Sequence, residues 1–197
     1  RRDHHSRASR GDGDLAYDVP DDFLGHHAEM RFVAFLRNVN LGQSGSPTRE
    51  QLESAFLQAG ASGAASVMSN GTLVFTVEGK LQAAEVSARA TAILTRTCGF
   101  SQPVFLREFD HLARLVADTP FAERPDLAHG ERCYSLFSPG AEQGHAAPIE
   151  STHRNCTVFR IGSGEAFSVT RVVNGTTGYP PPMLKTAPGV PTTTRAW

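Results

Sequence analysis

The order of two kinds of segment between residues 30 and 108 constrains the fold of this chain more than any other feature of its sequence. Four short runs rich in apolar and β-forming residues predict strands, at residues 31–37, 64–69, 72–77 and 103–107. Two segments with apolar residues at helical spacing, residues 48–59 and 81–97, separate the first strand from the second and the third from the fourth. This β-α-β-β-α-β order is that of ferredoxin-like folds, in which two right-handed crossovers share one antiparallel sheet. We therefore predict an α+β protein whose first half is ferredoxin-like.

Residues that favour turns and helix ends support these boundaries. Thr48 is followed three residues later by Gln51, which is the capping-box pattern of a helix start, and Gly99 follows the second helical segment. Asn70 and Gly71 separate two apolar runs, and both residue types tolerate positive φ. The Asn-Gly pair therefore predicts a tight β-hairpin.

The rest of the chain predicts a second, smaller α+β lobe packed against the first. We expect a helix at residues 109–117, and we expect strands at residues 132–137, 156–161 and 166–172. Gly162-Ser163-Gly164 suits a hairpin between the last two strands. The predicted division is a ferredoxin-like subdomain at residues 30–108 and a second α+β subdomain at residues 109–197.

The two ends of the chain differ from the predicted fold. Residues 1–29 are rich in Arg, Asp, Gly, Ser and His, and this composition cannot support a packed core. We expect them to be a disordered or extraneous extension, and they lack the apolar stretch of a secretory signal. The pattern just before Trp197 is typical of a helix start, so we expect the intact protein to continue beyond it.

Composition places the chain among globular proteins. It has 197 residues, of which 40% are hydrophobic and 20% charged, and its net charge of −1 gives no general attraction for nucleic acid or an anionic membrane. No apolar run is long enough to cross a bilayer. Cys98, Cys133 and Cys156 are an odd number without a C-x-x-C pair, which favours buried thiols in a reducing, cytoplasmic location over disulfides or a zinc site. We predict no cofactor, and nothing in the sequence indicates the oligomeric state.

Four segments carry a resemblance to a known family: Phe35-Leu-Arg-Asn-Val-Asn-Leu-Gly42, Met68-Ser-Asn-Gly-Thr-Leu-Val-Phe75, Thr119-Pro-Phe121 and Gly189-Val-Pro-Thr-Thr-Thr-Arg-Ala-Trp197. In this order they resemble the family catalogued as domain of unknown function 1697. The resemblance covers residues 30–197 and implies a ferredoxin-like first half, a second α+β half and no assigned activity. Asn38 stands where the family usually has Gly, so the chain is a divergent member in its first loop.

Candidate ligand-binding residues flank the first predicted strand and the Asn-Gly turn. Arg37 and Asn40 follow the strand, where loops gather ligand groups. The guanidinium fork suits a carboxylate or phosphate, and the amide offers both a donor and an acceptor. In the structural alternative, Arg37 pairs with a carboxylate of the first helix and Asn40 ties the loop backbone. Asn70 either presents donors to a ligand or only forms the turn.

A second group of candidates lies near the end of the chain. Thr192-Thr-Thr-Arg195 is predicted to start a helix, whose free amides and dipole would attract an anion. Thr194 and Arg195 would then contact the anion, with Lys185 and Arg171 supplying further charge. The structural alternative is a Thr cap with Trp197 as a packing anchor.

Histidines 111, 129, 145 and 153 show no i, i+4 pair, so we predict surface histidines and no metal site. Gly162-Ser-Gly-Glu165 is no phosphate loop, because it lies between two strands and opens no helix.

Three hypotheses for function follow. The first is a protein that binds a small anionic or phosphate-containing molecule in a cleft between the two lobes; nucleic acid is disfavoured, because residues 31–35 lack the aromatic and basic pattern of RNA-binding sheets. The second is an enzyme acting on a phosphorylated or carboxylated small molecule, in which a His or Glu converges with Arg37 or Arg195 in a pocket. The third is a structural or interaction module, in which Arg37, Asn40 and Arg195 contact the protein's own backbone.

Overall fold

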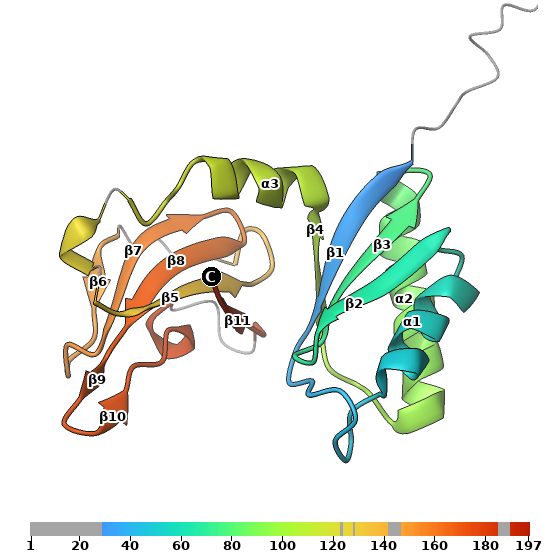
Figure 1. Cartoon of the computed structure of the whole chain (residues 1–197), viewed down its shortest axis with the longest axis horizontal. Helices are drawn as coiled ribbons and strands as arrows, with labels where there is room; N and C mark the ends of the chain where they lie inside the picture. The colour runs from blue at the N-terminus through green and yellow to red at the C-terminus, as the bar shows by residue number, and fades with distance from the viewer. Residues whose placement is uncertain (1–28, 123, 128, 142–146, 185–189) are drawn as a thin grey trace, which may run out of the picture.

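The computed structural model describes residues 29–122, 124–127, 129–141, 147–184 and 190–197, which form a mixed α+β structure. Its two large sheets lie side by side, with two helices on the outer side of the first sheet (Figure 1). The predicted α+β class is confirmed. Most predicted elements of the two halves are present within one or two residues of their expected bounds.

The first sheet has four strands, all paired antiparallel. In spatial order they are β2 (Gly63–Met68), β3 (Thr72–Val77), β1 (Met30–Leu36) and β4 (Val104–Glu108). The two helices on its outer face are α1 (Arg49–Gln58) and α2 (Lys80–Cys98). β2 and β4 are therefore the edge strands, and β1 and β3 are central strands, each paired with a strand on either side.

The helix ends are formed by the residues that the sequence indicated. Thr48 Oγ1 accepts a hydrogen bond from the Gln51 backbone N–H at 3.2 Å, and the Thr48 N–H donates to Gln51 Oε1 at 2.8 Å. This reciprocal pair satisfies two of the free donors at the start of α1. Gly99 ends α2 in the left-handed conformation, with φ of 74°.

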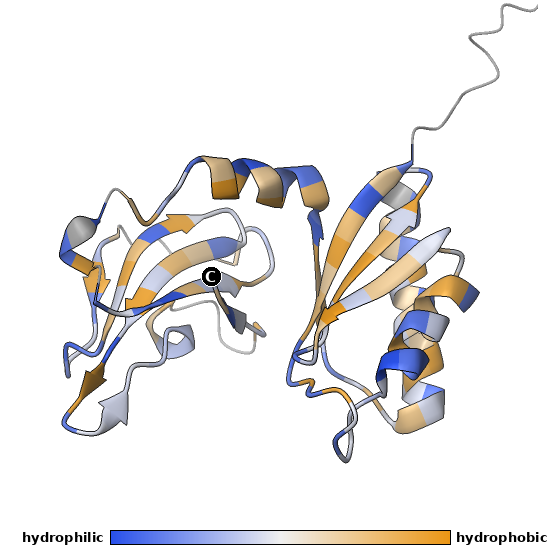
Figure 2. Cartoon of the chain, in the orientation of Figure 1, coloured by the Kyte–Doolittle hydropathy of each residue, from blue (hydrophilic) through white to orange (hydrophobic). Residues whose placement is uncertain are grey.

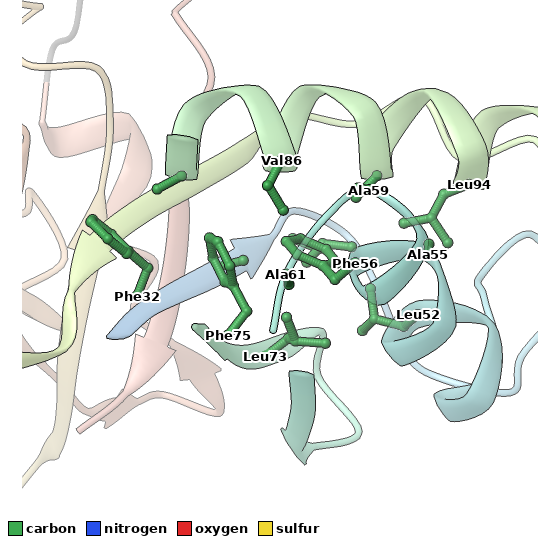
Figure 3. Close-up of a cluster of buried hydrophobic side chains, with 14 of the residues drawn as sticks. Phe32, Leu52, Ala55, Phe56, Ala59, Ala61, Leu73, Phe75, Val86 and Leu94 are labelled. Atoms are coloured by element: carbon green, nitrogen blue, oxygen red, sulfur yellow. The ribbon is translucent and has the colours of Figure 1, made fainter. Parts of the chain in front are cut away.

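The first hydrophobic core lies between this sheet and its two helices. Phe75 of β3 is 1% exposed and packs against Phe56 of α1 and Phe32 of β1, with ring centroids 5.0 and 5.9 Å apart (Figure 3). Figure 2 shows that hydrophobic residues predominate along β1 and β3, whereas hydrophobic and hydrophilic residues alternate on the helices. The apolar face of each helix is thus buried against the sheet.

The second half contains one helix and a five-stranded sheet. α3 (Phe109–Ala117) follows β4 directly. The sheet has antiparallel neighbours throughout, in the order β11 (Thr193–Ala196), β5 (Glu131–Leu136), β8 (Glu165–Thr170), β7 (Cys156–Gly162) and β6 (Ile149–Glu150). The predicted hairpin at residues 162–164 is present and joins β7 to β8.

Two predictions for the second half were wrong. Thr192-Thr-Thr-Arg195 does not start a helix, because residues from Thr193 form β11 and pair with β5. β-branched threonines favour extended backbone, and pairing with the edge of β5 stabilises a strand over a helix cap at these residues. The strand predicted to reach residue 172 ends at Thr170, and a separate hairpin follows, made of β9 (Val172–Val173) and β10 (Thr176–Thr177).

A second core lies between the two sheets and joins the halves. Val33 and Phe35 point from β1 towards Tyr134 of β5 and Phe167 of β8, and all four are buried. Trp197 packs against Tyr134 and Phe167, with centroid distances of 5.7 and 5.4 Å. Because one face of β1 packs on the helices and the other on the second sheet, the molecule has three layers. A third cluster, with Phe137, Val158, Ala166 and Leu184, covers the far side of the second sheet.

Candidate functional site

A pocket of about 340 Å³ opens where β4 and α3 meet the β7–β8 hairpin. We call it the seam pocket, because side chains from both halves line it. Its walls are Phe32, Leu106, Arg107 and Glu108 of the first sheet, His111 and Arg114 of α3, and Pro139, Ser163 and Glu165 of the second half. The pocket therefore combines an apolar side with five ionisable side chains.

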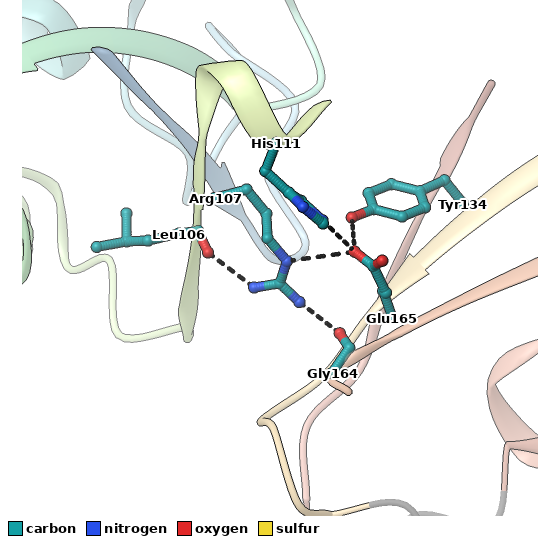
Figure 4. Close-up of polar contacts among 6 residues, drawn as sticks. All are labelled: Leu106, Arg107, His111, Tyr134, Gly164 and Glu165. Atoms are coloured by element: carbon teal, nitrogen blue, oxygen red, sulfur yellow. Dashed lines mark hydrogen bonds and ion pairs between the residues drawn. The ribbon is translucent and has the colours of Figure 1, made fainter. Parts of the chain in front are cut away.

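Glu165 is the centre of the polar contacts at this pocket (Figure 4). Its Oε2 accepts hydrogen bonds from the Tyr134 hydroxyl at 2.6 Å and from His111 Nε2 at 2.9 Å. Arg107 Nε lies 3.8 Å from the same oxygen. Since a carboxylate only accepts, the imidazole proton of this contact is on Nε2. The side chains of Glu165 and Arg107 are each 13% exposed, so the charges face one another away from bulk water.

Arg107 ties the two halves together at the pocket. One terminal nitrogen donates to the Gly164 carbonyl of the hairpin, and the other donates to the Leu106 carbonyl at 2.7 Å (Figure 4). The hairpin needs glycine at this place: Gly164 has φ of 77°, and a Cβ there would lie 2.9 Å from the Phe137 carbonyl oxygen. The guanidinium can therefore approach the hairpin backbone directly.

Burial shifts the ionisation of Tyr134. Its pKa is raised above the ordinary tyrosine value, mainly because the ring is buried, and further because the hydroxyl donates to Glu165. The neutral phenol is therefore held as the hydrogen-bond donor to the carboxylate.

One cation at the pocket has no acidic partner. Glu108 pairs with Lys80, whose Nζ is 2.8 Å from its carboxylate, and Arg107 faces Glu165. Arg114 is exposed and forms no ion pair within 4 Å with any described residue. It is the positive charge that remains available to a bound molecule.

The two arginines singled out in the sequence, Arg37 and Arg195, each form a hydrogen bond between the two halves. Arg37 Nε donates to the Thr192 carbonyl at 3.0 Å, and an Arg195 terminal nitrogen donates to the Leu36 carbonyl at 2.7 Å. Each guanidinium thus holds the backbone of the opposite half. Burial lowers the pKa of Arg195 below its ordinary value. Along β1, Leu36 and Phe32 are separated by about 13 Å at ~3.3 Å per residue, so this arginine pair lies away from the seam pocket.

The remaining predicted site residues are dispersed. The Asn40 backbone N–H donates to Ser46 Oγ at 3.2 Å, and Asn70 Oδ1 accepts from the Thr72 hydroxyl at 2.8 Å. A terminal nitrogen of Arg171 donates to Thr157 Oγ1 at 2.5 Å, and the Thr194 and Ser135 hydroxyls are 2.8 Å apart. Lys185 lies outside the described residues. The ligand-binding role of these residues stays a prediction.

None of the residues that line the seam pocket was predicted as a site residue from the sequence, although one signal was present. Glu165 is in phase with Phe167 and Val169, which alternate towards the core between the sheets. An acidic residue on the inward face of such a strand is uncommon unless it is paired. Its partner His111 was predicted as a surface histidine, and its side chain is 36% exposed and bonded to Glu165.

The fold defines an α+β protein with a polar pocket between its two sheets. A family model described as "Protein of unknown function (DUF1697)" matches residues 30–167, and the chain belongs to this family. The resemblance inferred from the four segments is thereby confirmed, although the segment at residues 189–197 lies beyond the matched span. No curated protein and no solved structure gives a significant match.

No helix in the described part of the chain has both the length and the apolar character that crossing a bilayer requires.

Proposed function

We propose that this protein binds a small anionic molecule, such as a phosphorylated or carboxylated metabolite, in the seam pocket. The observation that carries the proposal is the convergence of Arg107, His111 and Arg114 in one pocket of about 340 Å³ between the halves. A cleft between the lobes was expected from the sequence, but different residues line it. Concave sites where a few polar groups converge beside apolar walls are typical of small-molecule binding.

The charges at the pocket favour an anion over a cation. Arg107 and Glu165 offset one another, as do Lys80 and Glu108, so Arg114 leaves a net positive charge. A guanidinium donates through a planar fork that matches the oxygens of a phosphate or carboxylate. His111 can add a second positive charge when it is protonated.

An enzyme is the second candidate function, and the contact between His111 and Glu165 favours it. A histidine held at 2.9 Å by a carboxylate that is only 13% exposed is oriented for proton transfer to or from a bound molecule. This pair lies in the pocket, whereas Arg37 and Arg195 are engaged with backbone carbonyls, as expected for a structural role.

We also propose that residues 30–108 are a ferredoxin-like subdomain and residues 109–197 a second, smaller α+β subdomain, in a cytoplasmic protein. The strand order β2-β3-β1-β4 and the two helices on one face support the first assignment. The buried thiols of Cys133 and Cys156 support a reducing compartment.

The binding proposal is tested by thermal unfolding and calorimetric titration with inorganic phosphate, propyl phosphate and propionate. We expect at least one of these anions to raise the stability, by ~2.7 kcal/mol at 100 times its Kd. Arg114→Ala should weaken that binding about tenfold, because a charged hydrogen bond is lost. Arg89→Ala is the matched control, since Arg89 is a 57% exposed arginine on α2 outside the pocket.

Unchanged binding of every anion by the Arg114→Ala variant would contradict the proposal, and so would the absence of any stabilisation of the wild-type chain.

A further inference from the structure

We infer that the anionic ligand of the seam pocket also carries a hydroxyl group, as polyol phosphates, sugar phosphates and hydroxy acids do, and that Glu165 accepts its hydrogen bond. This inference rests on the proposed function and adds the second recognition group. It follows from the unequal use of the two oxygens of the Glu165 carboxylate.

Oε2 of Glu165 is fully occupied, whereas Oε1 is not. Oε2 accepts from Tyr134 and His111 at 2.6 and 2.9 Å and faces Arg107 at 3.8 Å. Oε1 makes no hydrogen bond with any described residue, and it is not one of the buried polar atoms without a partner, so water reaches it where Glu165 lines the pocket. The side chain as a whole is only 13% exposed. A carboxylate that is largely removed from water requires donors on both oxygens. A ligand that displaces water from the pocket must therefore supply a donor to Oε1.

The charges favour a neutral hydroxyl over an ammonium as that donor. The charge of Glu165 is already offset by Arg107, so a ligand ammonium at Oε1 would lie close to a guanidinium of the same sign. The spare positive charge is on Arg114. A ligand that places its anion at Arg114 and a neutral donor at Glu165 matches both ends of the pocket.

The spacing between Glu165, which would accept from the hydroxyl, and Arg114, which would bind the anion, limits the size of the ligand. His111, which contacts Glu165, and Arg114 are three residues apart on α3, so their side chains leave the same face of the helix from Cβ atoms about 5–6 Å apart. About four or five single bonds of ~1.5 Å in a small molecule bridge such a distance. Glycerol 3-phosphate has an anionic group and hydroxyls at this spacing.

The test compares glycerol 3-phosphate with propyl phosphate, which has the same three-carbon chain and phosphate without the hydroxyls. Titration calorimetry or ligand-detected NMR should give about tenfold tighter binding of glycerol 3-phosphate, the value of one hydrogen bond to a charged acceptor. In Glu165→Gln this preference should fall to about threefold or less, because the acceptor is neutral. Glu85→Gln is the matched control: this carboxylate lies on α2 outside the pocket, is 73% exposed and is paired with Arg89, so the preference should be unchanged.

The outcomes separate the two proposals. Equal binding of the two phosphates would overturn the hydroxyl inference and leave anion binding intact, whereas binding of neither would overturn both. Tighter binding of phosphoethanolamine than of glycerol 3-phosphate would assign an ammonium instead of a hydroxyl and would also overturn the inference. If Glu165→Gln does not fold, the comparison of the three ligands on the wild-type chain decides.

Discussion

Replacing Arg195 by methionine separates a structural role for the arginine pair from a ligand-binding role. Methionine keeps the apolar stem of the side chain and removes the guanidinium. The guanidinium donates to the Leu36 carbonyl at 2.7 Å, to Thr193 Oγ1 at 2.8 Å and to the Thr194 carbonyl at 3.0 Å. Each hydrogen bond from a charged donor contributes ~1.5–3 kcal/mol.

A desolvation cost offsets part of that gain. Arg195 Nε is buried without a hydrogen-bond partner among the described residues, and burial lowers the pKa of the group. Holding a cation out of water without a carboxylate costs several kcal/mol. Because Leu36 is 0% exposed, the substitution also leaves its carbonyl without this donor. We therefore expect Arg195→Met to lower the free energy of unfolding by about 1–3 kcal/mol.

Urea unfolding followed by fluorescence or circular dichroism measures this change as a shift of the midpoint at constant slope. Arg37→Met is the matched comparison, and it should cost less, about 0.5–1.5 kcal/mol. Arg37 makes only one hydrogen bond to the opposite half, at 3.0 Å, and because this side chain is partly exposed, water offsets part of that bond's contribution. Stabilisation by phosphate should be unaffected in both variants. If Arg195→Met is as stable as the wild type but no longer gains stability from phosphate, the structural explanation fails and the arginine pair is the anion site.

Two further predictions concern a turn and a buried thiol. Gly71→Ala should lower the free energy of unfolding by ~2 kcal/mol or more, because φ is 75° and the new Cβ would lie 2.7 Å from a neighbouring side-chain carbon. Gly99→Ala is the control: φ is 74° and nothing lies within 4 Å of its new Cβ, so it should cost only ~1 kcal/mol. Equal urea midpoints for the two variants would refute the steric argument. Burial raises the pKa of the Cys156 thiol to about 11, so its contribution to stability is complete below pH ~9 and is lost as the pH rises towards 11. In the Cys156→Ala variant the urea midpoint should fall less steeply between pH ~9 and 11, and an unchanged pH profile would count against the shifted pKa. In the wild-type chain Cys98, which is partly exposed, should react with iodoacetamide before the buried Cys133 and Cys156.

Elements defined by local chemistry could be predicted from the sequence. The Thr48 and Gln51 side chains cap α1 with hydrogen bonds between residues three apart, and the Asn70-Gly71 pair forms the turn between β2 and β3. Neither signal depends on tertiary packing. Asn174-Gly175 carries the same type of signal, and there the structure has the β9–β10 hairpin.

Elements defined by distant partners could not be predicted in this way. Residues 193–196 are a strand because β5 offers a free edge, about 60 residues earlier in the chain, and the threonine run itself suits a helix cap equally well. The role of Arg107 was hidden for a similar reason, since its contact with Gly164 joins residues 57 apart in the sequence. Local spacing carries no information about such pairs.

The location of the seam pocket within the family span gives it priority over the arginine pair as a site to test. The matched residues 30–167 include every residue that lines the pocket, from Phe32 to Glu165, whereas Arg195 lies outside the span. Arg195 lies on β11, an edge strand of the second sheet, and both arginines donate to backbone carbonyls of the opposite half. In the pocket, by contrast, Arg114 and Oε1 of Glu165 keep binding capacity that no described residue uses. Unused charge and unused acceptor capacity in one concave site are what a small-molecule ligand satisfies, so ligand screens on this chain should be interpreted first at the seam pocket.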